Sequence, residues 1–218
     1  MINKEVKFCV KCVESNQRFL GSVTHEDKKD RAQTRTSFDE NQVCSACLYY
    51  DYKKTVDWKK REEELIELLD KYRRNDGYYD VVVPGSGGKD SIFVAHTLKH
   101  KYKMNPLTCT WAPHMYTDVG WRNYIQWVDS GYDNYFHKPD GSVHRELTRL
   151  SFKNLLQPFQ PFAQGQVYFP LRIALEKKIK LVVYGDSQAE RGSGGNLHSF
   201  NNKFLSQALY TYKEDKDL

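Results

Sequence analysis

The sequence predicts an α/β fold, in which a parallel sheet carries helices on both faces and a small zinc-ribbon module precedes it. Two Cys-x-x-Cys pairs, at 9–12 and 44–47, predict the module. A glycine-rich stretch at 86–91 follows a short apolar run that is typical of a buried strand. Further apolar runs then alternate with helical patterns, and this alternation is typical of parallel strands joined by helices.

Composition limits the class of protein. The chain has 218 residues, 39% of them hydrophobic, which suits one sizeable domain and a small additional module. No apolar run reaches the length of about 18 residues that a membrane span requires, and residues 1–5 do not resemble a signal peptide. We therefore expect a cytoplasmic protein that does not enter a membrane. The net charge of +5 is spread along the chain, so nucleic-acid binding is not expected.

Four cysteines predict a structural zinc site: Cys9, Cys12, Cys44 and Cys47. Each Cys-x-x-Cys turn supplies two ligands, and in a cytoplasmic protein a metal explains such a grouping better than disulfides do. Four thiolates fill a tetrahedral site and leave no position for a substrate, so the site serves folding. The polar segment 21–40 between the pairs is expected to form a loop or hairpin. An iron–sulfur cluster or a redox pair is the alternative.

Turn signals and composition divide the chain into three parts. The zinc-ribbon module covers 1–56, a connecting helix covers 57–75 and a nucleotide-binding α/β domain covers 76–218. Asn75-Asp76-Gly77 is a turn signal at the second boundary. The connecting helix is expected from Asp57 to Tyr72. Its apolar residues recur at helical spacing: Leu65, Leu68, Leu69 and Tyr72.

The α/β domain is expected to contain four strands, at 79–83, 106–110, 132–136 and 181–184. Because ligands of such folds bind beyond the carboxyl ends of the strands, the glycine-rich loop and the segment after Thr110 should share a crevice. The polar segment 185–192 follows the fourth strand, and we expect it to form a second half of the site.

Helices are expected between these strands. One opens at Ser91, and Asp118 caps a second. The apolar residues of the second helix lie on one face: Trp121, Tyr124, Ile125 and Val128. Another helix follows the turn Pro139-Asp140-Gly141. Prolines should keep 157–162 irregular, where its rings and glutamines either line a pocket or pack on the sheet, and Pro170 should start a short helix.

The glycine-rich loop has the chemistry of a phosphate site. Gly87 and Gly88 sit at a strand-to-helix turn, where unpaired backbone N–H groups gather and no Cβ obstructs an anion. Ser86 and Ser91 add hydroxyl donors. Asp90 separates Lys89 from Ser91, which rules out a Walker A loop.

Asp90 also implies a cation. A carboxylate beside a polyphosphate is favourable only when a positive ion lies between them, so Mg²⁺ is expected. The direction of Lys89 is open. The alternative is that the two glycines form no more than a tight connection between strand and helix.

The stretch Ser86-Gly87-Gly88-Lys89-Asp90-Ser91 resembles the PP-loop of the ATP pyrophosphatase superfamily, whose members split ATP between its α and β phosphates. The whole chain resembles the N-acetyl sugar amidotransferase family of bacterial surface-polysaccharide and nonulosonic acid pathways. Besides the cysteine pairs and the loop, the similarity includes these segments: 117–120, 131–134, 139–141, 143–145, 158–162 and 184–186.

This resemblance implies an activity. ATP would activate the N-acetyl carbonyl of a sugar as an adenylate, pyrophosphate would leave, and ammonia would displace AMP to give an acetamidino group. Family members commonly have Gly-Glu-Asn where this chain has Gly185-Asp186-Ser187. They also usually extend further, so the chain is either a fragment or a short member of the family.

Candidate site residues follow from the loop and the resemblance. The catalytic candidates are Lys89, Asp90, Asp118 and Asp186. The nucleotide-binding candidates are Ser86, Gly87, Gly88, Asp90, Ser91 and Thr110. The substrate-binding candidates are Arg122, Gln164, Glu190 and Arg191. His114 and His144 are further candidates as bases, although single histidines on loops and helices seldom act in catalysis.

The source of ammonia is expected to be a separate protein. A glutaminase needs an activated cysteine, whereas four of the five cysteines form the metal site and Cys109 lies in an apolar strand. We therefore expect a glutaminase subunit as partner. Two other functions stay open: a PP-loop tRNA-modifying thiolase or ligase, and a noncatalytic zinc-ribbon adaptor that binds a nucleotide.

Overall fold

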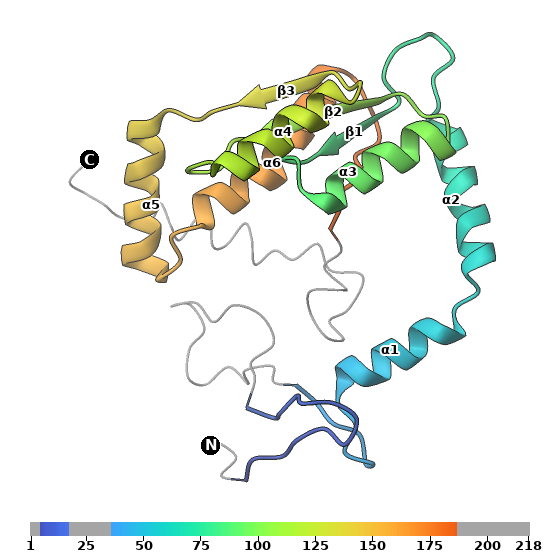
Figure 1. Cartoon of the computed structure of the whole chain (residues 1–218), viewed down its shortest axis with the longest axis vertical. Coiled ribbons are helices and arrows are strands. Elements are labelled where there is room, and N and C mark those ends of the chain that lie inside the picture. Colours follow the sequence, from blue (N-terminus) through green and yellow to red (C-terminus); the bar gives the residue numbers. More distant parts are fainter. Residues whose placement is uncertain (1–4, 18–35, 187–218) are drawn as a thin grey trace. The chain divides into compact units, whose positions relative to one another are not determined.

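The computed structural model of the chain describes residues 5–17 and 36–186, and these form two compact units that divide between Trp58 and Lys59 (Figure 1). The smaller unit contains the four cysteines and α1 (Ser45–Thr55). The larger unit contains α2 (Trp58–Tyr72) from its second residue onward, and it contains the sheet. None of the described helices combines the length and the apolar character that crossing a bilayer requires.

The sheet of the larger unit is parallel, as predicted. Its strands are β1 (Val81–Pro84), β2 (Pro106–Trp111) and β3 (Asn134–His137), in the order β1-β2-β3. Val82 pairs with Leu107, and Trp111 at the end of β2 pairs with His137 at the end of β3. The carboxyl ends of these two strands therefore lie side by side.

The fourth expected strand is reduced to a single bridge. Val182 pairs in parallel with Val82, on the opposite side of β1 from β2. The Val82 N–H donates to the Leu181 carbonyl at 2.9 Å, and the Val183 N–H donates to the Val82 carbonyl at 3.0 Å. The segment 181–183 thus follows β1 closely enough to carry Gly185 to the same end of the sheet, although it forms no longer strand.

Helices cover both faces of the sheet, which confirms the predicted α/β class (Figure 1). On one face α3 (Lys89–His96), its π-helical continuation η1 (Thr97–Lys101) and α4 (Asp118–Asp129) pack around Val81 and Val83. On the other face α6 (Gln160–Glu176) packs on Val82 and Leu107. The alternation of side chains along β1 separates these two layers, and α5 (Gly141–Leu155) packs beside α6.

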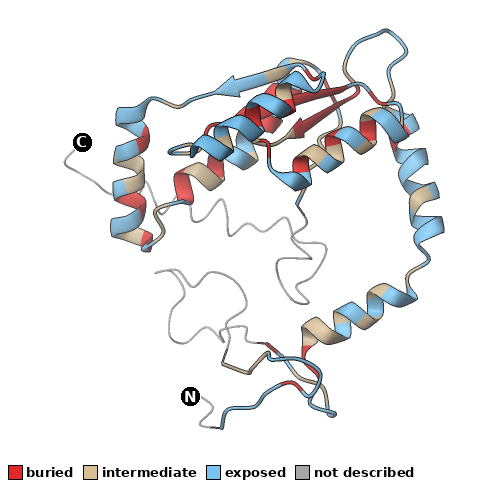
Figure 2. Ribbon diagram, viewed as in Figure 1, coloured by how far each residue is buried: buried red, intermediate tan, exposed pale blue. Residues whose placement is uncertain are grey.

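The buried faces of α2 and α4 are narrower than the apolar pattern predicts. In α2 only Leu69 is buried, whereas Leu65 and Leu68 are exposed. In α4 the buried side chains are Tyr124 and Trp127, and Trp121 and Ile125 are exposed. Figure 2 shows the buried residues as narrow red stripes on helices that are otherwise pale blue or tan. Helical spacing identifies a possible face, but contact with the sheet decides how much of it is covered.

Two predictions about the prolines of 157–170 are wrong. Residues 160–162 are not irregular, because they form the first turn of α6, where Pro161 lacks only an N–H that would have no helical partner. Pro170 does not start a helix but lies inside α6 and is buried. The packing of α6 on the sheet, with Ile173 and Ala174 in the core, outweighs the interior proline.

The start of α4 also differs in detail. Thr117, and not Asp118, is the N-cap, because its side-chain oxygen accepts a hydrogen bond from the Gly120 N–H at 3.0 Å. Asp118 is the first helical residue, where its charge still favours the positive end of the helix.

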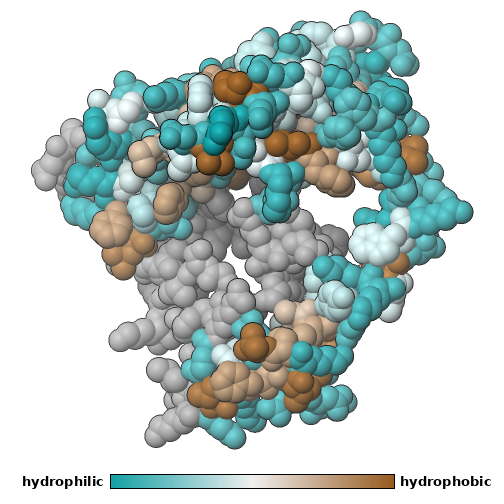
Figure 3. Space-filling view, viewed as in Figure 1, coloured by the Kyte–Doolittle hydropathy of each residue, from teal (hydrophilic) through white to brown (hydrophobic). Residues whose placement is uncertain are grey.

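The two units differ in surface character. Figure 3 shows mainly hydrophilic side chains over the visible face of the larger unit, with small hydrophobic patches between them. The smaller unit has few described residues yet leaves several apolar side chains exposed, including Val10, Val13 and Phe8. Its buried cluster consists mainly of Cys9, Val43 and Cys44. So small a core among the described residues of this unit indicates that something besides their apolar burial stabilises them.

Candidate functional site

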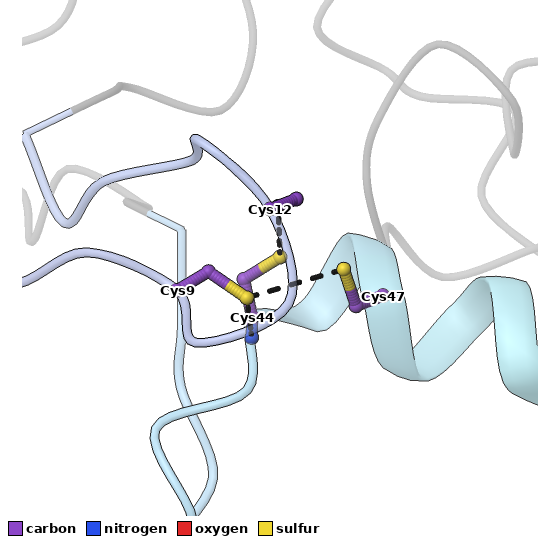
Figure 4. A group of neighbouring side chains, drawn as sticks. All are labelled: Cys9, Cys12, Cys44 and Cys47. Carbon is purple, nitrogen blue, oxygen red and sulfur yellow. Dashed lines mark hydrogen bonds between the residues drawn. The ribbon is translucent and has the colours of Figure 1, made fainter.

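The four cysteine sulfurs of the smaller unit converge on one point (Figure 4). All four Sγ atoms lie within 4.8 Å of one another. The Cys9 and Cys47 sulfurs are 3.9 Å apart, and those of Cys12 and Cys44 are 3.6 Å apart. A tetrahedral zinc ion with Zn–S bonds of about 2.3 Å holds its sulfurs about 3.8 Å apart, whereas a disulfide requires about 2 Å. The cluster therefore has the geometry of a four-cysteine zinc site.

Local backbone structure brings the cysteines together. Antiparallel bridges join Phe8 to Ser15 and Phe38 to Cys44. The first cysteine pair lies in the turn between Phe8 and Ser15, and the second lies at the start of α1, where Cys44 is the N-cap. The Cys9 sulfur accepts hydrogen bonds from the N–H groups of Lys11 and Cys44, both at 3.3 Å. These bonds stabilise a thiolate and join the two pairs directly.

The thiols of the cluster have pKa values that differ widely. Burial raises the pKa of Cys9, but the backbone N–H groups of Cys44 and Lys11 outweigh it and lower the value to about 6. The hydrogen bond with Cys12, followed by burial, raises the pKa of Cys47 to about 12. Four neighbouring thiols cannot all ionise without a cation between them, so a metal that binds here must displace protons.

The glycine-rich loop of the larger unit depends on glycine at two positions. Gly87 has φ +86°, and a Cβ there would lie 2.6 Å from the backbone nitrogen of Tyr124 in α4. A Cβ at Gly85 would lie 2.5 Å from the side chain of Ser91 and 2.6 Å from the ring of Trp127. The loop is therefore pressed against α3 and α4, and only glycine fits these contacts.

Gly88, unlike Gly85 and Gly87, has open surroundings. It is the N-cap of α3, and a Cβ at this position would meet no atom within 4 Å. The N–H groups at the start of α3 have no helical partners, and the helix dipole makes this end positive. Gly88 therefore leaves open space where an anion can reach the first turn of α3.

The loop faces a cleft of about 270 Å³. On one side the cleft is lined by the loop residues Ser86, Gly87 and Gly88. On the other it is lined by the segment after β2 and the first turns of α4: Pro113, Met115, Tyr116, Thr117, Gly120 and Asn123. This confirms that the loop and the segment after Thr110 share a crevice. The first turns of two helices border the same cleft, which favours a negatively charged ligand.

Tyr116, Thr117 and Asn123 are cleft residues that the sequence analysis missed. Threonine and aspartate are both preferred N-cap residues, so the sequence pattern alone did not distinguish Thr117 from Asp118. Tyr116 is largely buried, and burial raises its pKa to about 12. Its side chain is therefore a neutral phenol at physiological pH.

The charged candidates of the loop are exposed. Lys89 Nζ lies 2.6 Å from Asp90 Oδ1, with 88% and 64% of the two side chains exposed. Such a pair contributes little to stability and leaves both groups accessible to a ligand. Ser91 is buried, and its hydroxyl donates to the Gly88 carbonyl at 3.0 Å. In this structure Ser91 stabilises the loop, and its assignment to the nucleotide stays a prediction.

Gly185, which follows the segment 181–183, lies against the start of α3. A Cβ at Gly185 would lie 2.7 Å from the Ser91 nitrogen and 2.9 Å from the Asp90 carbonyl oxygen. Because the two backbones touch here, the exposed Asp186 comes close to the first turn of α3, which carries Asp90. Two carboxylates beside an anion-binding loop offer the oxygen ligands that Mg²⁺ prefers.

The remaining candidate site residues predicted from the sequence are spread over several elements. Thr110 is fully buried, and its hydroxyl accepts a hydrogen bond from Asn134 Nδ2 at 3.2 Å, so this side chain belongs to the sheet. Asp118 and Arg122 are exposed on α4. Gln164 is buried in α6. The predictions for Glu190 and Arg191, like most of segment 21–40, fall outside the described residues.

The fold and the site together define an α/β protein with an open cleft beside a glycine-rich loop at one end of a parallel sheet, joined to a four-cysteine module. No family model matches the chain. An uncharacterized protein of Methanocaldococcus jannaschii is 31% identical over 80 residues, which are 37% of this chain. The chain spans only 28% of the length of that protein.

Among solved structures, the NH3-dependent NAD synthetase of Campylobacter jejuni, in complex with nitrate, is similar over 71% of this chain and 73% of its own. The identity is 18% and the TM-score is 0.48.

Proposed function

We propose that this protein is a PP-loop ATP pyrophosphatase that forms an acetamidino sugar from an N-acetyl sugar, ATP and ammonia. The opening of Ser86 and Gly88 into a cleft that also borders the first turns of α4 carries the proposal. A triphosphate needs several fixed donors at a positive helix end, and this cleft offers them from two helices.

The chemistry consists of two displacements. The acetyl oxygen of the sugar attacks the α-phosphorus of ATP, and the bond to the bridging oxygen breaks, so that pyrophosphate leaves with the electron pair. Ammonia then attacks the activated carbon, one N–H proton is lost, and the C–O bond breaks to release AMP. The N–H groups around Gly88 favour the first step, because they stabilise the charge that develops on the departing pyrophosphate.

Two metal ions belong to the proposal. The exposed carboxylates of Asp90 and Asp186 are the residues that would hold Mg²⁺, which neutralises polyphosphate charge when it is bound. Zinc in the four-cysteine cluster is structural, because four thiolates leave no open position.

The ammonia is proposed to come from a separate glutaminase subunit. Cys109 lies in β2 with 1% of its surface exposed, and burial raises the pKa of its thiol to about 12. A buried, protonated thiol is not an activated nucleophile. The other four of the chain's five cysteines form the metal cluster.

The test is the sugar-dependent exchange of labelled pyrophosphate into ATP, with a panel of N-acetylated sugars as acceptors. Asp90→Asn should reduce the exchange by about a hundredfold or more, as expected when a charge that positions the metal and polyphosphate is lost. Asp129→Asn removes the same charge from an exposed position at the end of α4 and should leave the exchange unchanged.

Two results would contradict the proposal. ATP binding without exchange for any acetylated sugar would indicate a nucleotide-binding adaptor. Exchange that depends on tRNA and not on a sugar would indicate a tRNA-modifying enzyme.

A further inference from the structure

Two histidines that lie far apart in the sequence form a close pair beside the cleft. His114 follows β2 and His144 belongs to α5, yet their ring centroids are 4.5 Å apart. His114 also stacks on Phe159, with 5.8 Å between centroids and 17° between planes, and lies 5.7 Å from Phe162. Trp111 meets His144 edge to face at 6.4 Å. We call these five residues the ring cluster.

The ring cluster adjoins the proposed adenylation cleft. His114 lies between Pro113 and Met115, and both of these residues line the cleft. Trp111 is the last residue of β2, so the cluster stands at the carboxyl end of the sheet, where the phosphate loop also begins. The short segment 113–117 therefore contributes residues to both the cleft and the ring cluster.

His144 has a buried polar atom that no described residue satisfies. The side chain of His144 is 9% exposed, and its Nε2 is buried without a hydrogen-bond partner. Burial, together with the charge of His114, lowers the pKa of His144, so that its ring is neutral at physiological pH. An unsatisfied buried polar atom of this kind destabilises the folded protein, and a ligand that supplies the missing hydrogen bond recovers that free energy.

Two other rings of the cluster are accessible to solvent. His114 is exposed and Phe159 is 59% exposed, so two ring faces are open to solvent beside the buried nitrogen. An exposed side chain such as that of His114 changes rotamer within nanoseconds, so the arrangement beside His144 can adjust to a ligand. Apolar ring faces around a single polar atom are typical of small-molecule sites. A pyranose matches them, because it has an apolar C–H face and polar groups at its edge.

We propose that the ring cluster binds the acceptor of the reaction, with a sugar ring against Phe159 and Phe162 and a polar substituent of the acetamido sugar hydrogen-bonded to Nε2 of His144. His114, whose ring centroid is 4.5 Å from that of His144, moves aside or stacks on the sugar when the acceptor binds. This inference rests on the proposed function, because it names the site that presents the acetyl group to the adenylation cleft.

Binding is tested without turnover. The full-length protein, with ¹⁵N-labelled histidine, is titrated by NMR with N-acetylglucosamine, N-acetylgalactosamine and N-acetylmannosamine, and with glucosamine as a probe that lacks the acetyl group. At least one N-acetyl sugar should shift the imidazole signals of His114 and His144, while glucosamine should shift them less. His96 and His100 form a second pair, 4.3 Å apart and exposed, and should not respond. No shift at His114 and His144 with any of the three sugars overturns the proposal.

Kinetics supply the second test. Phe159→Ala should raise the KM for the acceptor about three- to tenfold, the loss expected for one aromatic contact, and leave the KM for ATP within about twofold. Phe152→Ala on α5 removes a phenylalanine of matched exposure, 57% against 59%, and should change neither value. Equal acceptor KM values for the two variants would contradict the inference.

The two proposals fail in different ways. If a sugar shifts the two histidines but supports no exchange, the ring cluster binds sugars and the adenylation is wrong. If exchange occurs while the histidine signals and the Phe159→Ala variant are unaffected, the function holds and the acceptor binds elsewhere.

Discussion

The four-cysteine cluster and the cleft are the two candidate ligand sites, and they are built in opposite ways. The cluster takes two sulfurs from a short turn and two from the start of α1, and the four sulfurs surround one point. The cleft takes its lining from the loop after β1, the segment after β2 and the first turns of α4, and it stays open. A closed site of thiolates suits a structural ion, whereas an open site of backbone N–H groups suits a ligand that must enter and leave.

The largest effect should come from removing a cysteine ligand. Cys44→Ser should abolish zinc binding and unfold residues 5–17 and 36–58, because metal binding in such small modules supplies about 10 to 16 kcal/mol and the apolar core of these described residues is small. Metal analysis and hydrogen exchange measure both effects. Residues 81–137 of the larger unit should keep their protection.

Cys109→Ala is the matched control, because it removes a buried thiol outside the cluster. It should leave one zinc per chain. Stoichiometric zinc in the Cys44→Ser protein would show that the four cysteines do not form a closed zinc site. The contrast between this cluster and the open cleft would then be wrong.

The next largest effect should come from substitutions in the glycine-rich loop, which distinguish a loss of stability from a loss of nucleotide binding. Gly87→Ala should destabilise the larger unit by about 2 kcal/mol or more, since φ is +86° and the Cβ would meet the Tyr124 backbone. Gly88→Ala should change the free energy of unfolding by less than about 0.5 kcal/mol, because nothing lies within 4 Å.

Nucleotide binding should nevertheless be weakened in both loop variants, because the Gly88→Ala methyl group enters the space that an anion would use. Chemical denaturation and ATP titration measure the two quantities. Wild-type ATP affinity in Gly88→Ala would show that the ligand does not approach this side of the loop.

A smaller effect is expected at the opposite wall of the cleft. Thr117→Ala removes the N-cap of α4 and should cost about 1 kcal/mol of stability, because the Gly120 N–H loses its acceptor. Thr117→Ser keeps the cap and should be close to wild type. If ATP affinity is the same in both variants, α4 contributes shape and no anion binding to the cleft.

The smallest effect concerns the cap of α5, which carries His144. The Asp140 carboxylate accepts hydrogen bonds from the N–H groups of Val143 and Ser142, at 3.0 and 2.8 Å, and these bonds lower its pKa. The stabilisation is present above the unfolded-state pKa of about 4 and is lost as pH falls through the lower folded pKa.

Asp140→Asn keeps a capping side chain without the charge. Its melting temperature should therefore fall less than that of the wild type between pH 6 and pH 3. Parallel decreases in the two proteins would show that the Asp140 charge does not contribute to folding.

The predictions from sequence succeeded where the signal is local. The strands at 81–84 and 106–111 lie within or beside the apolar runs that predicted them, and the cysteine pairs converge as their spacing indicated. They failed where packing overrides local preference. Pro170 is a strong helix breaker by itself, but inside α6 its ring is buried and the core of the sheet holds the helix together.

The difference between the predictions that succeeded and those that failed has a physical cause. Residue types and short spacings by themselves determined the strand-to-helix turn with its glycines, the candidate metal ligands and the parallel α/β class, because each depends on backbone freedom or on neighbours a few residues away. Only the tertiary structure decided that Tyr116 and Asn123 line the cleft, that Thr110 faces Asn134, and that His114 meets His144. Those contacts join residues from separate elements, and the way in which helices settle on the sheet determines them.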